Sequence, residues 1–295
     1  MNRRRLLIAL LPVGLLAVAT VGRAQKPAET PATPENIEAA FKLTLAAAAE
    51  YEFRIGKDEK EKPLELIRES KLKWSNPAAS DIQGNVFLWT REGRPLVVGS
   101  LYKWFSPKSR MEHEFHSLAE ESLSAKFHGK PVWKTDEVGL KFVDVPNAGA
   151  PAANEAKRLL QLKQLAKEFT GIGKYRKDPN DTELRLLPHP IHSYAAPKQD
   201  IINGGLFAFV RGTDPEIILL IEARGKDVAN ARWQFAVARM SNIAELRLRH
   251  QNKQVWATEL LTWGDVFGSH ELAYTAFAFN EIPDFLKEAI PKLKP

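Results

Sequence analysis

The sequence predicts an α+β protein in which mainly antiparallel β-sheets, built from hairpins, are covered by a few helices. Short apolar runs that alternate with polar residues recur along the chain, and turn signals rich in glycine, asparagine or proline separate many of them. Helical spacing is confined to a few segments. There is no cysteine, which excludes disulfides and thiolate metal sites, so the fold must depend on apolar burial.

The first 24 residues have the pattern of a secretory signal peptide. Arg3–Arg5 precede the apolar run Leu6–Val21, and small residues end at Ala24. The strongly apolar run favours the general secretory route, although the sequence leaves twin-arginine export open. We expect an exported protein, periplasmic or extracellular, without a stable membrane span after cleavage. Residues 25–34, which contain several prolines, are expected to form a flexible tether.

Removal of this leader changes the charge of the protein. The leader carries four arginines and no acidic residue, which leaves 38 basic residues (42 − 4) against 36 acidic ones. The formal charge falls from +6 to +2 (38 − 36). This balance gives no basis for a nucleic-acid interface.

Residues 35–146 are expected to form a helix followed by strands. Thr33 and Pro34 have the pattern of a helix cap and first turn, and the helix should end near Glu50. Alternating apolar residues predict strands at 51–55, 64–74, 85–90, 95–104 and 138–145. The turn signal at 91–94 joins two of them in a hairpin.

The segment Ser109–Phe127 is compatible with a helix or with strands. Ser109 and Glu112 match a capping box, and the apolar residues after them keep helical spacing. The same residues also alternate as a strand, and a hairpin turn follows before Trp133. Strands from about His113 are favoured.

Small residues and proline at Asn147–Ala153 mark an internal boundary, which divides the chain into residues 35–146 and 152–295. An amphipathic helix should follow the boundary and end at Gly171, with Gly171–Lys174 as a helix stop. Strands are expected at 182–187, 205–223 (a hairpin), 232–240, 244–249, 255–260 and 272–279, and a closing helix at 283–293. No internal repeat is evident.

The hairpin at Gly204–Arg224 is expected to be the centre of the fold. Its two runs, Leu206–Val210 and Ile217–Ile221, are apolar on both faces of the strand. Each face therefore needs a cover. The helix after residue 153 can cover one face and the strands of the first half the other, in which case the halves form one packed unit.

Four histidines in two HxxH pairs are candidate metal ligands: His113, His116, His189 and His192. On a strand, residues three apart point to opposite faces, so a metal site requires the two pairs to converge in space. Glu114 or Asp144 would then be a further ligand or base. This is the alternative function, a metal-dependent hydrolase with a divalent metal. The simpler interpretation is that these are polar strand and loop residues, with no cofactor.

Tryptophans are frequent in the strand-rich first half, and most are expected in the core. Trp104, with Lys103 and Arg110 beside it, is the candidate ligand-binding patch, because exposed aromatic rings stack on sugars or peptides. The chain lacks the GxSxG, GxGxxG, P-loop and HExxH signatures. The main interpretation is therefore a non-catalytic envelope or extracellular protein that binds a polysaccharide or another envelope protein.

Several short segments together resemble a group of exported proteins of unknown function from planctomycete-type bacteria. They are Trp74–Pro77, Phe87–Trp89, Gly205–Val210, Thr213–Pro215 and Glu222–Arg224. The resemblance covers most of the mature chain and implies export and a bacterial origin. It carries over no catalytic residue.

Overall fold

The computed structural model describes residues 33–56, 61–76, 81–105, 109–135, 138–178 and 180–289. The expected signal peptide, 1–24, and nearly all of the expected tether, 25–34, lie outside these ranges. Within them the protein consists mostly of antiparallel sheets with few helices, as the sequence predicts. No helix in the described part of the chain is long and apolar enough to span a membrane.

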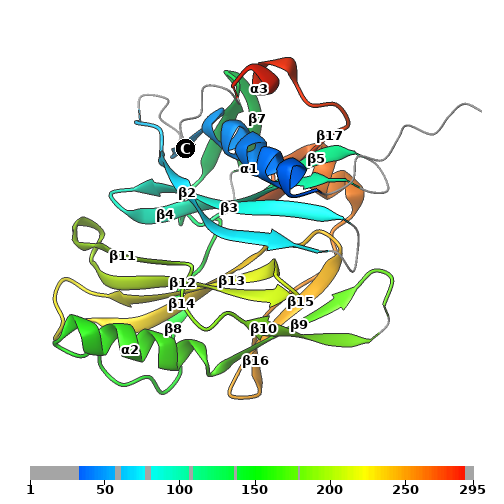
Figure 1. Ribbon diagram of the computed structural model, residues 1–295. Coiled ribbons are helices and arrows are strands. Elements are labelled where there is room, and N and C mark those ends of the chain that lie inside the picture. The colour runs from blue at the N-terminus through cyan, green and yellow to red at the C-terminus, as the bar shows by residue number, and fades with distance from the viewer. Residues whose placement is uncertain are drawn as a thin grey trace, which may run out of the picture.

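One layer of the protein is a five-stranded sheet (Figure 1). Its strands, in spatial order, are β17 (Tyr274–Phe279), β5 (Arg110–Ser117), β4 (Arg94–Trp104), β3 (Ile82–Arg91) and β2 (Glu65–Ser75). One face of this sheet is covered by α1 (Pro34–Ala49) and by a three-stranded sheet of β1 (Tyr51–Ile55), β6 (Leu123–Phe127) and β7 (Lys130–Thr135). The short helix α3 (Asp284–Ala289) lies beside α1.

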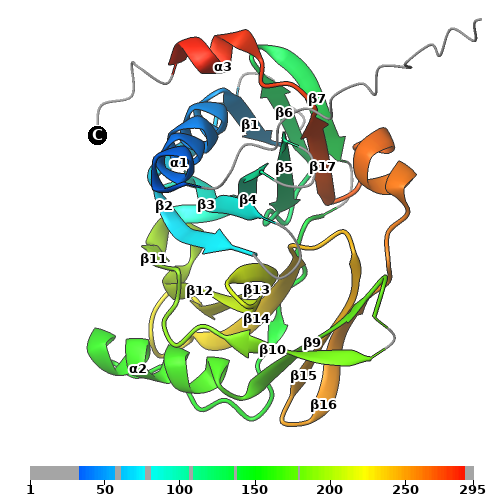
Figure 2. The same ribbon diagram turned by 45° about the vertical axis from the view of Figure 1, so that its right-hand side comes forward.

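The second layer is a nine-stranded sheet that curls round a helix, α2 (Glu155–Ala166). Its strands, in spatial order, are β16 (Lys253–Thr258), β15 (Ala244–His250), β9 (Phe169–Tyr175), β10 (Asp181–Leu186), β12 (Ile201–Arg211), β13 (Asp214–Arg224), β14 (Arg232–Arg239) and β8 (Val143–Asp144). A further strand, β11 (His192–Ala196), pairs with β12. The two layers lie against each other in Figure 2.

The β12–β13 hairpin is buried on both faces. On one face, Phe207 and Phe209 pack in a buried cluster with Leu162 of α2. On the other, Ile218 and the residues that share its face pack with Val86 and its neighbours from β3 and β4. The two large sheets therefore share one apolar interior.

Several predictions of the local structure are confirmed. Thr33 caps α1 by accepting a hydrogen bond from the Asn36 N–H, and Pro34 begins the helix. The ambiguous segment 109–127 forms the strands β5 and β6 and contains no helix. The alternation of side chains favours strands, and the pairing of β5 with both β4 and β17 stabilises the strand conformation of this segment.

Other predictions are wrong in detail. The helix α2 ends at Ala166, and Gly171 and Gly173 lie in β9 rather than at a helix stop. A Cβ on Gly171 would lie 2.9 Å from the Phe209 ring, so this glycine lets the ring pack against the strand. The expected strand at 138–145 is reduced to Val143–Asp144. The strand β11 was not predicted, because prolines precede it and it is short.

The expectation of no internal repeat is also wrong. The order α1, β1–β7 in the first half matches α2, β9–β16 in the second, with β10 and β11 together in the place of β2. The strand pairing matches as well: β6 pairs with β1 and β7, and β15 pairs with β9 and β16. The central hairpin is β3–β4 in the first half and β12–β13 in the second. The first pairs with the bulged strand β2 on one side and with β5 on the other. The second pairs with β11 and with β14 in the same way.

The match is closest between residues 65–104 and 185–224, which share an offset of 120 (185 − 65). Trp74 pairs with Gly84 in the first half, and Tyr194 pairs with Gly204 in the second. A Cβ on either glycine would meet the ring opposite, at 2.3 Å for Trp74 and 2.4 Å for Tyr194. Both hairpins also carry an irregularity at the same position, after Trp89 and after Phe209.

A second match lies in the β6–β7 and β15–β16 hairpins. The sequence Lys-x-Val-Trp-x-Thr occurs at both 130–135 and 253–258. Each copy follows a turn of two residues with positive φ, His128–Gly129 and Gln251–Asn252. This short shared sequence is the signal by which the repeat is detectable in the sequence.

The last strand of each half crosses to the other half. β8, which follows β7, pairs with β14 of the second half, while β17, which follows β16, pairs with β5 of the first. The boundary expected at 147–153 separates the two copies in sequence. In space, each copy completes the sheet of the other.

Candidate functional site

The repeat places two matched polar sites between the halves. In each, the tight turn of one central hairpin reaches the strand ends of the other half. The first site is centred on Arg94, which begins β4, and the second on Asp214, which begins β13. Because of the offset of 120 residues (214 − 94), these two residues occupy equivalent positions.

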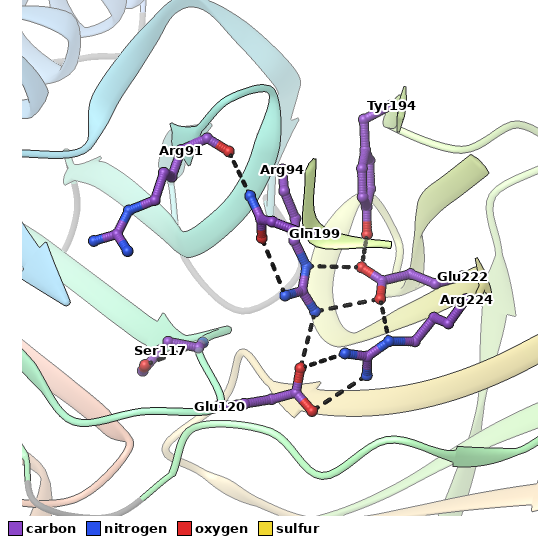
Figure 3. A network of polar contacts seen from close by, with 9 residues as sticks. Arg91, Arg94, Ser117, Glu120, Tyr194, Gln199, Glu222 and Arg224 are labelled. Atoms are coloured by element: carbon purple, nitrogen blue, oxygen red, sulfur yellow. Dashed lines mark hydrogen bonds and ion pairs between the residues drawn. The ribbon is translucent and has the colours of Figure 1, made fainter. Parts of the chain in front are cut away.

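The first site is a buried network of ion pairs (Figure 3). The Arg94 guanidinium donates to the Glu222 carboxylate through Nε at 3.0 Å and Nη2 at 3.2 Å. The Tyr194 hydroxyl donates to the same carboxylate at 2.6 Å. Glu120 then accepts from Arg94 at 3.3 Å and from Arg224 at 2.7 Å. Glu222 has no exposed surface, so the hydrogen bonds from Arg94 and Tyr194 replace the water that its carboxylate loses on burial.

The surroundings favour the ionised forms of Arg94 and Glu120 in this first site. Burial opposes the charge of Arg94, but the attraction of Glu222, Tyr194 and Glu120 together outweighs it and raises the pKa of the guanidinium. For Glu120, burial is outweighed by hydrogen bonds and attraction from Arg224, and the pKa falls below its usual value. The first site is thus internally neutralised, with two carboxylates facing two guanidiniums.

The second site is a cavity of about 520 Å³. Five of its lining residues are the counterparts of the five members of the ion-pair network. Trp74 corresponds to Tyr194, Tyr102 to Glu222, Trp104 to Arg224 and Asp214 to Arg94 through the offset of 120. Beyond the central hairpin the offset is 122, because Gly99 pairs with Phe115 and Leu219 with Val237, so Asn242 corresponds to Glu120. The cavity opens beside Ile243 and Trp263, whose side chains are exposed.

Four carboxyl groups line the cavity: Glu112, Glu114, Asp214 and Glu216. Each has polar neighbours that favour its ionised form. The Tyr102 hydroxyl donates to Glu112 at 2.8 Å, and the Tyr274 hydroxyl donates to Glu114 at 2.5 Å. The Asn76 amide donates to Asp214 at 3.1 Å, and the Ser241 and Tyr175 side chains lie beside Glu216.

Burial raises the pKa of all four carboxyl groups. The pKa of Glu114 lies well above its usual range, and burial raises that of Glu112 despite Tyr102 and Arg110. Burial and the neighbouring Glu216 raise the pKa of Asp214, and burial raises that of Glu216 to about 6. The hydrogen bonds and nearby cations of the cavity therefore do not fully offset the burial of its carboxyl groups.

Two of the three residues predicted as a ligand-binding patch line this cavity. The Trp104 indole forms part of the wall, and the Arg110 guanidinium lies 4.5 Å from the centre of the Trp104 ring and pairs with Glu112 at 2.6 Å. Lys103 does not line it. Its side chain is buried on the other face of β4, where Nζ donates to the Trp104 carbonyl at 3.2 Å and to Ser109.

The four histidines predicted as metal ligands do not form one group. His113 is buried in the aromatic core, where Nδ1 lies 2.9 Å from the Tyr51 hydroxyl. His116 contacts the Ser117 carbonyl at 2.8 Å, and His192 stacks on Tyr194. His189 is exposed. In the described ranges, no three His, Asp or Glu side chains lie together as a metal-ligand set.

The carboxyl groups of the cavity were missed in the sequence, apart from Glu114, which was considered only as a metal ligand or base. Asp214 and Glu216 share one face at the start of a strongly apolar strand, and this pair of acids was the available signal. No protein-family model, curated protein or solved structure matches the chain. The function is therefore inferred from the site itself.

Proposed function

We propose that this protein is a non-catalytic, exported binding protein whose ligand enters the cavity between its two halves. The main support is the composition of the cavity wall, in which the rings of Trp74, Tyr102 and Trp104 adjoin carboxyl groups. Aromatic surface with a few oriented polar groups is the usual composition of a ligand site. Residues from both halves contribute to it, so the intact chain is required.

The size of the cavity limits the ligand. A volume of about 520 Å³ falls within the range of roughly 300–1,000 Å³ that is typical of small-molecule sites. The ligand is then a small molecule or one end of a longer chain, such as a terminal sugar of a polysaccharide or a side chain of an envelope protein. The proposal of export, to the periplasm or the cell exterior, rests on the leader pattern of residues 1–24.

One exposed residue of the cavity wall can be enlarged to narrow the cavity without disturbing the apolar core. Ala278 is an exposed residue of β17 that lines the cavity. Its counterpart in the exchanged strand of the other half is Asp144. Ala278 pairs with Glu112 of β5, and Asp144 pairs with Gln234, which lies at the same register of β14. Ala278→Trp therefore narrows the cavity, and Asp144→Trp adds the same ring elsewhere as a matched control.

The purified mature protein is titrated with a panel of oligosaccharides and small amines. Binding is detected by the change in tryptophan fluorescence and by the shift in Tm. We expect saturable binding of at least one compound to the wild type and to Asp144→Trp, and its loss in Ala278→Trp. Failure of the whole panel to bind, or unchanged binding by Ala278→Trp, would contradict the proposal.

A further inference from the structure

The ion-pair network shows what fills the first site. There the Arg94 side chain places a guanidinium between the Glu222 and Glu120 carboxylates. At the equivalent position of the second site stands Asp214, which is shorter and has the opposite charge. The second site thus lacks the guanidinium that fills the first, and a cavity is present in its place.

The neighbouring replacements change the groups that surround this position. Tyr102 and Trp104 stand where the first site has Glu222 and Arg224. They remove one guanidinium and one carboxylate and line the cavity with aromatic rings, on which cations bind favourably. Asn242 likewise stands in the place of the Glu120 carboxylate, so the acidic groups of the cavity come from other positions, Glu112, Glu114 and Glu216 as well as Asp214. The cavity already shows this kind of contact, since the Arg110 guanidinium lies over the Trp104 ring.

The charges around the cavity also leave room for a cation. Among the described residues that line it, four carboxyl groups are accompanied by two guanidiniums, those of Arg110 and Arg211. Two more guanidiniums lie behind the wall, Arg239 near Glu114 and Glu216 and Arg176 on the Trp263 ring. Arg239 directs its N–H groups to the carbonyls of Ser241, Ala244 and Glu259 and to the Thr258 hydroxyl, so it attracts the carboxylates without donating a hydrogen bond to them. On the cavity wall itself, the carboxyl groups outnumber the guanidiniums by two (4 − 2) among the described residues.

We infer that the ligand of the cavity is a small organic cation that carries a guanidinium or ammonium group on an apolar stem. The charged group binds beside Asp214, in the place that corresponds to the guanidinium of Arg94, and the stem lies against Trp104. This inference rests on the proposed function and names its ligand class. A bound cation would oppose the effect of burial and lower the raised pKa values of Asp214 and Glu216.

The experiment compares n-butylguanidinium with n-butylurea, a neutral molecule of nearly the same shape, by calorimetry on the mature protein. We expect the cation to bind at least about tenfold more tightly than the urea, the ratio expected for a charge-assisted hydrogen bond. Asp214→Asn should weaken binding of the cation by about tenfold or more and leave binding of the urea unchanged. Ala278→Trp should abolish binding of the cation, and Asp144→Trp should not.

A second variant separates loss of the ligand site from loss of the fold. Asp214→Arg restores the residue found at the equivalent position 94 and should fill the cavity with its own guanidinium. We expect it to lose binding of n-butylguanidinium while its Tm stays at or above that of the wild type. Unchanged binding by Asp214→Arg would overturn the inference.

The remaining outcomes distinguish the inference from the function on which it rests. Equal binding of n-butylguanidinium and n-butylurea, or binding of an oligosaccharide but of neither probe, overturns the cationic ligand and leaves a binding protein. Binding of the cation that persists in Ala278→Trp places it outside the cavity and also overturns the inference. If no compound binds, both the inference and the proposed function fail.

Discussion

Arg94 and Asp214 occupy equivalent positions in the two halves of this protein and have opposite charges. Each is the first residue of the second strand of its central hairpin, and each is followed by a proline. Arg94 is bound within a buried network, whereas Asp214 lines a cavity. The difference between a closed and an open site thus begins with one residue.

Replacement of Arg94 by alanine is expected to destabilise the protein by about 3–5 kcal/mol, because it leaves the buried Glu222 carboxylate without its main partner. The double variant Arg94→Met with Glu222→Leu should recover much of this loss, since it removes both charges. Urea denaturation measures both values. A loss below about 1 kcal/mol in Arg94→Ala would show that the pair contributes little.

The glycines Gly84 and Gly204 are expected to be sensitive to alanine in the same way. In each case the new Cβ would overlap the ring of Trp74 or Tyr194, and overpacking of this kind costs about 1–3 kcal/mol. Gly149→Ala is the matched control, since no atom lies within 4 Å of the position that its Cβ would take and its φ is not positive. Thermal unfolding of the three variants tests the equivalence of the two halves.

Glu216 should make the protein less stable as the pH rises. Its pKa of about 6 in the folded state exceeds the usual 4.5, so the folded state holds this proton more tightly. The stability from this group is present below pH 4.5 and is lost as the pH rises through 6. The loss amounts to about 2 kcal/mol. Glu216→Gln should reduce the difference in unfolding free energy between pH 4.5 and pH 8 by that amount.

His113 should have the opposite effect in acid. Burial lowers its pKa from 6.5 to about 3, so the unfolded chain takes up a proton that the folded protein excludes. Stability is then lost as the pH falls below 6.5, by about 2 kcal/mol at pH 5. His113→Phe should be less sensitive to acid than the wild type. Tyr51→Phe, which leaves the imidazole buried, should remain as sensitive.

The strands and the hairpins were predictable because each depends on neighbouring residues. The apolar alternation of β12 and β13 and the capping residue Thr33 are local signals, and the structure confirms them. The cavity was not predictable in this way. It joins Tyr102 to Asp214, more than a hundred residues apart, through the packing of one half on the other. Trp104 and Arg110 were identified as a patch, but their carboxyl partners were not.

The exchange of β8 and β17 bears on the origin of the chain. A polypeptide with a single copy of the repeat would end in a strand that completes only another molecule's sheet. Two such polypeptides would form a domain-swapped homodimer with twofold symmetry, and symmetry would force its two sites to be identical. Covalent fusion of the copies removes that constraint. In the fused chain the two sites can differ, as the ion-pair network at Arg94 and the cavity at Asp214 do.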